Sequence, residues 1–272
     1  MQDYYERSFS DLIVERRGAV IWITLNRPNF SNAFSDEMIV DLCHVLREAD
    51  WDDDIWTIVI TGAGKNFCAG GDVKAMEEQT GMFAGDPEAL RRRYSKGIQQ
   101  IPLTMESLET PVVAMVNGAA IGAGCDLACM CDIRVGCQFS RFGETFAKLA
   151  LVPGDGGAFF LQRVVGYAKA MELSLTGRIV DPEEALALGL LNQLVDRDEL
   201  LAATEKLVDS ITANSPVAVS MIKKAIRNAR TVEIYGHLDL VAAFQGITQR
   251  THDHAEGVLA LKEKRLPKFI GN

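Results

Sequence analysis

One arrangement occurs twice in this chain: an apolar strand runs into a turn of glycines and other small residues, and a helix with an acid in or beside its first turn follows. The first copy is VITGAGKNFCAGGDVKAM at residues 59–76, and the second is VVAMVNGAAIGAGCDLA at residues 112–128. Glycine lets backbone N–H groups approach a ligand closely, and a helix N-terminus adds positive partial charge. Two such turns facing one point would hold an oxygen that becomes negative during a reaction.

Nucleotide-binding loops fit these turns poorly. GAGCDL lacks the third glycine of the GxGxxG pattern, and GAGKNF stops short of the Gly-Lys-Ser/Thr ending of a phosphate loop. The simplest alternative is a glycine turn that only reverses the chain, which is the commoner situation for either loop alone. Both interpretations stay open at this level.

Strand-like and helical segments alternate along the first two thirds of the chain, which predicts an α/β fold with parallel strand pairs and right-handed crossovers. A hairpin is expected around Arg17-Gly18, and a helix is expected from the N-cap Ser35. The segment from Gln79 to Gln100 is expected to be a long, polar, mobile stretch, in which RRRY at residues 91–94 is most simply a solvated helix face. We therefore expect one large core with an appendage.

The last third of the chain has helical periodicity and almost no strand signal. Before it, a helix is predicted between Asp181, which caps it, and Gly189, which ends it. These patterns divide the chain into a core at 1–199 and a helical C-terminal region at 200–272.

Composition excludes several functions. The net charge of −9 and the pI near 5.0 argue against nucleic acid and anionic membranes as partners, and no apolar run is long enough to span a bilayer. The first residues do not have the pattern of a secretory signal, so we expect reduced thiols and a cytoplasmic location. No metal site is expected, because paired CxxC spacing is missing among the cysteines, which are Cys43, Cys68, Cys125, Cys129, Cys131 and Cys137.

Four motifs resemble those of the crotonase, or enoyl-CoA hydratase/isomerase, superfamily in order and spacing: LNRPNFSNAFS, FCAGGDVKAM, VNGAAIGAGCDLACMCDIRV and ALVPGDGGAFFLQRVVG. The resemblance runs from about Leu12 to the closing KRLPKFIG. It implies a crotonase-type spiral of ββα turns, with the helical C-terminal region serving oligomerisation and pocket cover. It further implies a homotrimer or a dimer of trimers that acts on acyl-CoA thioesters, with no permanently bound cofactor beyond the coenzyme A of the substrate.

The resemblance also assigns roles to residues around the two turns. The N–H groups of Gly71 and Ala123 would form the oxyanion hole for the thioester oxygen, each donor contributing about 3 kcal/mol. Arg27 and Lys65 would contact the phosphates of coenzyme A, and Lys268 with Phe269 would reach the coenzyme A of an adjoining subunit. The remaining coenzyme A contacts would come from the residues flanking the first turn, namely Cys68, Ala69, Gly70, Asp72 and Val73.

The acids depart from the hydratase pattern, which has two catalytic glutamates. Asp126 stands at one of these positions, and Phe146, which cannot transfer a proton, stands at the other. Two nearby acids are candidate substitutes. Asp155 follows Pro153-Gly154 and is either catalytic or an ordinary turn residue. Glu144 points either inward or into solvent, and exposure is the commoner state of a glutamate.

The predicted function is processing of an acyl-CoA through a stabilised thioester enolate, with hydration of a 2-enoyl-CoA as the leading reaction. Hydration needs one group to activate water and another to manage the α-proton, and Phe146 weakens that pair. Double-bond isomerisation needs only one base. Thioester hydrolysis or carbon–carbon cleavage is a third possibility, and a non-catalytic relative that binds coenzyme A is the alternative outside enzymes.

Overall fold

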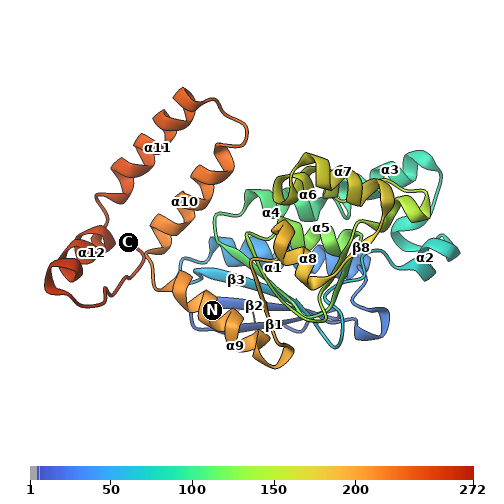
Figure 1. Ribbon diagram of the computed structural model, residues 1–272, viewed down its shortest axis with the longest axis horizontal. Coiled ribbons are helices and arrows are strands. Elements are labelled where there is room, and N and C mark those ends of the chain that lie inside the picture. The colour runs from blue at the N-terminus through green and yellow to red at the C-terminus, as the bar shows by residue number, and fades with distance from the viewer. Residues whose placement is uncertain (1–4, 6) are drawn as a thin grey trace.

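The computed structural model describes residue 5 and residues 7–272 and shows an α/β core from which three C-terminal helices extend (Figure 1). The main sheet has the strand order β1-β2-β3-β4-β6-β9, in which only β1 and β2 pair antiparallel. Its strands are β1 Leu12–Arg17, β2 Val20–Leu25, β3 Thr57–Gly62, β4 Val112–Val116, β6 Ile133–Cys137 and β9 Gln193–Val195. The predicted hairpin and the α/β class are confirmed.

A second sheet has three short strands in the order β5-β7-β8. These strands are β5 Ala119–Ile121, β7 Arg141–Gly143 and β8 Ile179–Val180. Its strand β5 leads into the second glycine turn and lies beside Cys68 of the first. The strands β5 and β7 run parallel, and each follows closely behind a strand of the main sheet. The chain therefore switches from the first sheet to the second directly after β4 and β6.

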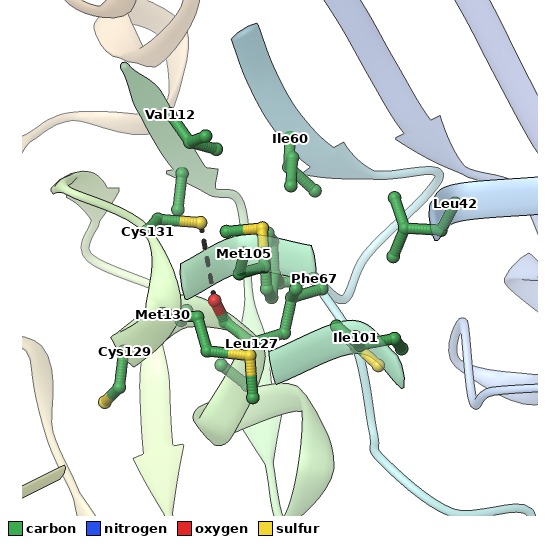
Figure 2. Packing of buried hydrophobic residues seen from close by; sticks show 14 of the residues in the cluster. Leu42, Ile60, Phe67, Ile101, Met105, Val112, Leu127, Cys129, Met130 and Cys131 are labelled. Carbon is green, nitrogen blue, oxygen red and sulfur yellow. Dashed lines mark hydrogen bonds between the residues drawn. The ribbon is translucent and has the colours of Figure 1, made fainter. Parts of the chain in front are cut away.

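Both faces of the main sheet are buried, as expected for parallel strands. In β2, Ile21 and Ile23 point to one apolar cluster, whereas Val20 and Trp22 point to the other, which follows from the two-residue period of a strand. The larger cluster lies under α1 (Asp36–Trp51), α4 (Gln100–Ser107) and α5 (Ala123–Met130). Figure 2 shows part of it, where Met105, Phe67 and Leu127 meet.

The helix caps that the sequence predicts are present. The Ser35 side chain accepts a hydrogen bond from the Met38 N–H (3.0 Å) at the start of α1, and Asp72 caps α2 (Val73–Glu78). Asp181 caps α8 (Pro182–Leu188), and Gly189 follows its last residue in the left-handed conformation. The solvated helix face expected at residues 91–94 is confirmed for the three exposed arginines of α3 (Pro87–Lys96).

Two further helices, α6 (Gly157–Val165) and α7 (Tyr167–Thr176), complete the core. The C-terminal region is helical as predicted, with α9 at Leu200–Thr212, α10 at Pro216–Asn228, α11 at Ile234–Thr248 and α12 at His252–Glu263. The first of these packs on the main sheet through Leu200 and Val208, while α10 to α12 extend away from the core (Figure 1). The boundary proposed at residue 200 stays a proposal. No helix among the described residues is long and apolar enough to cross a membrane.

Candidate active site

The two glycine turns lie against each other. The N–H groups of Phe67 and Cys68 both donate to the Ala119 carbonyl at 3.0 Å, and the Cys68 carbonyl accepts from the Ile121 N–H at 2.9 Å. Through these bonds the first turn runs beside β5, which leads into the second turn. The sheet switch after β4 therefore brings together two segments that are about fifty residues apart in the sequence.

This contact requires glycine at two positions. An added Cβ on Gly124 would lie 2.0 Å from the Cys68 carbonyl oxygen, which is far inside van der Waals contact. Gly70 has a φ of +84°, and a Cβ there would lie 2.5 Å from the Ile121 oxygen and 3.0 Å from the Ala123 nitrogen. The small residues thus serve close backbone approach between the turns, beyond chain reversal.

The N–H groups of Gly71 and Ala123 donate to no partner within the described part of the chain. Ala123 is the first residue of α5, so its N–H is one of the free donors of a helix N-terminus. The Gly70 carbonyl accepts from the Phe34 N–H at 2.8 Å, and the Gly71 N–H on the same trans peptide points the opposite way. Because a Cβ on Gly70 would lie only 3.0 Å from the Ala123 nitrogen, both free donors belong to the place where the turns meet.

Three buried carboxyl groups form a cluster next to these turns. Asp126 lies one helical turn after Ala123 on α5, Glu144 directly follows β7, and Asp155 precedes α6. Their exposed fractions are 0%, 2% and 6%. Glu144 therefore points inward. The solvent-exposed position, which is the commoner state of a glutamate, is wrong for this residue. The Gly122 N–H ties the second turn to this cluster by donating to the Gly143 carbonyl at 2.7 Å.

Burial dominates the electrostatics of the cluster. It raises the pKa of Asp126 well above the usual range, and the charge of Glu144 and a hydrogen bond with it raise that pKa further. Burial also raises the pKa of Glu144, although hydrogen bonds from Asp126 and the Cys125 thiol act in the other direction. The pKa of Asp155 is raised to about 6, first by burial and then by the charge of Glu144. Carboxyl groups with such pKa values are suited to proton transfer near neutral pH.

Asp126 is packed against the start of α6. A Cβ on Gly157, the first residue of that helix, would lie 2.3 Å from Asp126 Oδ1. The glycine therefore leaves the space that the carboxyl group fills. The helix N-terminus favours a negative charge at this place, yet the pKa of Asp126 is raised, so the cost of burial outweighs the helix dipole.

Two aromatic rings border the cluster. The Phe146 ring lies 3.7 Å from the position of a Cβ on Gly122, so an apolar surface stands at the turn where a hydratase would place its second glutamate. Tyr94 on α3 lies against Gly154, and its pKa is raised by burial and by the charge of Asp155. Sequence reasoning missed Tyr94, because it ends the polar run RRRY whose three arginines are exposed.

The residues expected to bind coenzyme A are only partly available. Lys65 is exposed, and no ion pair or hydrogen bond of its side chain occurs within residues 5 and 7–272. Arg27 is instead engaged inside the chain, since it donates to the Ala33 carbonyl at 2.6 Å and pairs with Asp72 at 3.3 Å and Asp11 at 3.6 Å.

Around the first turn, three of the expected backbone donors are occupied. The N–H groups of Cys68, Ala69 and Gly70 donate to the Ala119 carbonyl, the Ser31 carbonyl and the Cys68 sulfur. Val73, at the start of α2, is 64% exposed and leaves an apolar surface beside Asp72. Any ligand of this turn must therefore use carbonyls, the apolar surface and the N–H groups that follow Gly70.

Lys268 and Phe269 lie far from these turns in the same chain. The terminal segment and α12 lie on the opposite side of the molecule from α2 (Figure 1). Phe269 lines a cavity of about 610 Å³ formed mainly by α10 and α12, and this cavity contains none of the three carboxyl groups. A joint site with the first turn would need a second copy of the chain.

Comparison with known proteins identifies the family that the motifs resemble, over nearly the whole chain. The family model described as enoyl-CoA hydratase/isomerase matches residues 15–272. The 1,2-epoxyphenylacetyl-CoA isomerase of Escherichia coli is 36% identical over 93% of this chain and 95% of its own length. The short-chain-enoyl-CoA hydratase of Clostridium acetobutylicum is 33% identical over 94% of this chain and 96% of its own length.

A solved structure agrees with these sequence relatives. The enoyl-CoA hydratase of Bacillus anthracis superposes with a TM-score of 0.89 at 32% identity, and the match covers 97% of this chain and 100% of that one. The crotonase-type fold expected from the motifs is confirmed. This chain belongs to the enoyl-CoA hydratase/isomerase family and is an enzyme that acts on acyl-CoA thioesters.

Proposed function

We propose that this enzyme hydrates a 2-enoyl-CoA through a thioester enolate whose oxygen is held by the N–H groups of Gly71 and Ala123. The observation that carries the proposal is the pair of unengaged donors at the contact of the two turns, beside a cluster of buried carboxyl groups. Preorganised donors of this kind each contribute about 3 kcal/mol to the stabilisation of a developing oxyanion. Conjugate addition of water needs this stabilisation, because its intermediate is an enolate.

The carboxyl cluster supplies the acid–base group that Phe146 cannot. Asp126, Glu144 and Asp155 are all buried, so the second glutamate of the hydratase pattern is replaced by acids at other positions of the same cluster. Burial raises the pKa of all three, and the pKa of about 6 of Asp155 suits proton transfer near neutral pH. Hydration therefore does not depend on a residue at position 146.

Double-bond isomerisation is the second candidate. The Phe146 ring makes the wall beside Gly122 apolar, and a site that excludes water suits a reaction in which a base only moves a proton between carbons. Similarity at 36% identity to a protein named 1,2-epoxyphenylacetyl-CoA isomerase supports the same reaction class. Thioester hydrolysis and carbon–carbon cleavage have no such supporting observation.

Binding of coenzyme A by this acidic chain would depend on local cations. We assign the phosphates to Lys65, whose ammonium group is free in the described structure, while Arg27 shapes the turn through its ion pairs. Lys268 and Phe269 would serve a neighbouring copy in a homotrimer or a dimer of trimers. Exposed apolar residues on the extended helices and on the segment after α12 support such an assembly, among them Ile226, Tyr235, Leu238, Leu261 and Leu266.

Incubation with crotonyl-CoA in deuterated water tests the proposal. Hydration removes the enoyl absorbance and adds the mass of heavy water to the product. A parallel reaction with a 3-enoyl-CoA detects isomerisation, because conjugation creates new absorbance. Hydration of crotonyl-CoA supports the proposal; conjugation of the 3-enoyl-CoA without any hydration would replace it by the isomerase assignment.

A further inference from the structure

Only one oxygen of the carboxyl cluster is open to solvent. Both oxygens of Asp126, both of Glu144, and Oδ1 of Asp155 are buried, and no backbone or side-chain N–H or hydroxyl group of the described residues donates to them. Asp155 Oδ2 is not enclosed in this way and takes part in no hydrogen bond or ion pair within the described residues, so it is the oxygen that reaches the surface. Among the three carboxyl groups, Asp155 is therefore the one that is accessible from outside.

The other two carboxyl groups face each other. Two ionised carboxylates only accept hydrogen bonds, so Asp126 and Glu144 can be bonded to one another only through a shared proton. No Lys or Arg forms an ion pair with either side chain within the described chain. Burial raises the pKa of both groups. One member of the pair is therefore a neutral acid that donates to the other, ionised member.

We propose that Asp155 is the only one of the three carboxyl groups that touches the reacting atoms, and that Asp126 and Glu144 behind it form a positioning pair. This inference rests on the proposed hydration. It differs from the roles implied by the family resemblance, in which the acid at position 126 transfers the proton. Here Asp126 is enclosed by Gly157 on one side and by Glu144 on the other.

A single carboxylate is sufficient for the reaction. The Asp155 carboxylate takes a proton from water while the water oxygen bonds to the β-carbon, and the electrons of the double bond move to the thioester oxygen. The enolate then collapses, and its α-carbon takes the proton back from Asp155. Water is the only co-reactant, and both new bonds form on the face that Asp155 lines.

The charge of Glu144 makes Asp155 a stronger base. The acids, thiols and phenol that face Asp155 or the pair behind it are Asp126, Glu144, Cys68, Cys125, Cys129 and Tyr94. Arg178 lines the same small void as Glu144, but it is ion-paired with Glu172 and Glu184. The pKa of about 6 of Asp155 follows from burial and from the charge of Glu144. Near pH 7 this carboxylate is largely ionised and yet more basic than an exposed aspartate.

Three isosteric variants of the full chain test the proposal, with Glu183→Gln as the matched control because Glu183 is exposed. For hydration of crotonyl-CoA, Asp155→Asn should lower kcat/KM by about 10²- to 10⁴-fold, the usual contribution of a general base. Asp126→Asn should stay within about tenfold of the wild type, because its amide donates to Glu144 and so preserves the pair. Glu144→Gln should keep activity but move the acidic limb of the pH–rate profile to lower pH.

A titration separates this inference from the proposed hydration. Carboxyl ¹³C NMR of the ligand-free protein, assigned with Asp155→Asn, should show Asp155 titrating near pH 6 in the wild type and in the control, and lower in Glu144→Gln. Glu144→Asp, which keeps the charge, serves if Glu144→Gln does not fold. An unchanged midpoint in Glu144→Gln, or an Asp126→Asn variant as inactive as Asp155→Asn, would overturn the proposal. Failure of the wild type to hydrate crotonyl-CoA would count against the proposed hydration alone. The titration of the ligand-free protein would still test how the three carboxyl groups are arranged.

Discussion

Replacing Asp155 by Asn should stabilise the folded protein at alkaline pH at the expense of activity. An acid whose pKa is higher in the folded state than in the unfolded state destabilises the fold once the pH rises through the unfolded value. Asp155 has a pKa of about 6 in the fold against an ordinary 3.8. This difference corresponds to about 3 kcal/mol at pH 8 and about 2 kcal/mol at pH 5. The penalty therefore grows by about 1 kcal/mol between these two pH values.

Urea denaturation of the wild type and of Asp155→Asn at pH 5 and pH 8 measures this difference. The protein concentration must stay fixed, because the stability of an oligomer depends on it. The free energy of unfolding of the variant should exceed that of the wild type by about 1 kcal/mol more at pH 8 than at pH 5. Asp53→Asn is the control, since Asp53 is exposed. Equal differences at both pH values would refute the reasoning.

Three further changes have defined outcomes. Gly124→Ala should lower both thermal stability and kcat/KM for crotonyl-CoA, because its methyl group would meet the Cys68 carbonyl at 2.0 Å and force the two turns apart; unchanged melting and kinetics would show that the contact is not needed. Lys65→Ala should raise KM for crotonyl-CoA about two- to fivefold with kcat unchanged, as expected for one exposed charge contact, and an equal KM would remove Lys65 from the phosphate site. Phe146→Glu should move the acidic limb of the pH–rate profile to higher pH, because one more negative charge beside Gly122 favours protonated Asp155; a limb at the same pH would place the new carboxylate outside the cluster.

The sequence was sufficient for the parts of the fold that depend on local chemistry. Ser35, Asp72 and Asp181 cap helices as predicted, because a short polar side chain before an apolar periodic segment satisfies free N–H groups. The strands of the main sheet follow from their apolar runs. Only residues 91–94 of the helix at Pro87–Lys96 were expected to be helical, because its composition is almost entirely polar and none of its residues is buried.

The residues of the candidate site could be predicted from the sequence, but the order of its three acids from solvent inward could not. Glycine spacing pointed to the two turns, but the separation of Gly70 from the Ala123 nitrogen depends on how two sheets meet, which no local pattern encodes. The burial of Glu144 has the same origin, since β7 pairs with β5 and turns that side chain inward. The order of the three acids from solvent inward, with Asp155 outermost, is likewise a property of the tertiary structure.

A comparison of Ala123→Pro with Ala123→Gly tests the central claim most directly. Proline fits the first position of a helix and removes only the N–H at that residue, while glycine keeps it. We predict that Ala123→Gly hydrates crotonyl-CoA within a few-fold of the wild type, whereas Ala123→Pro loses about 10²- to 10³-fold in kcat with an unchanged circular dichroism spectrum. Full activity in a folded Ala123→Pro enzyme would contradict the proposal that this amide holds the enolate oxygen.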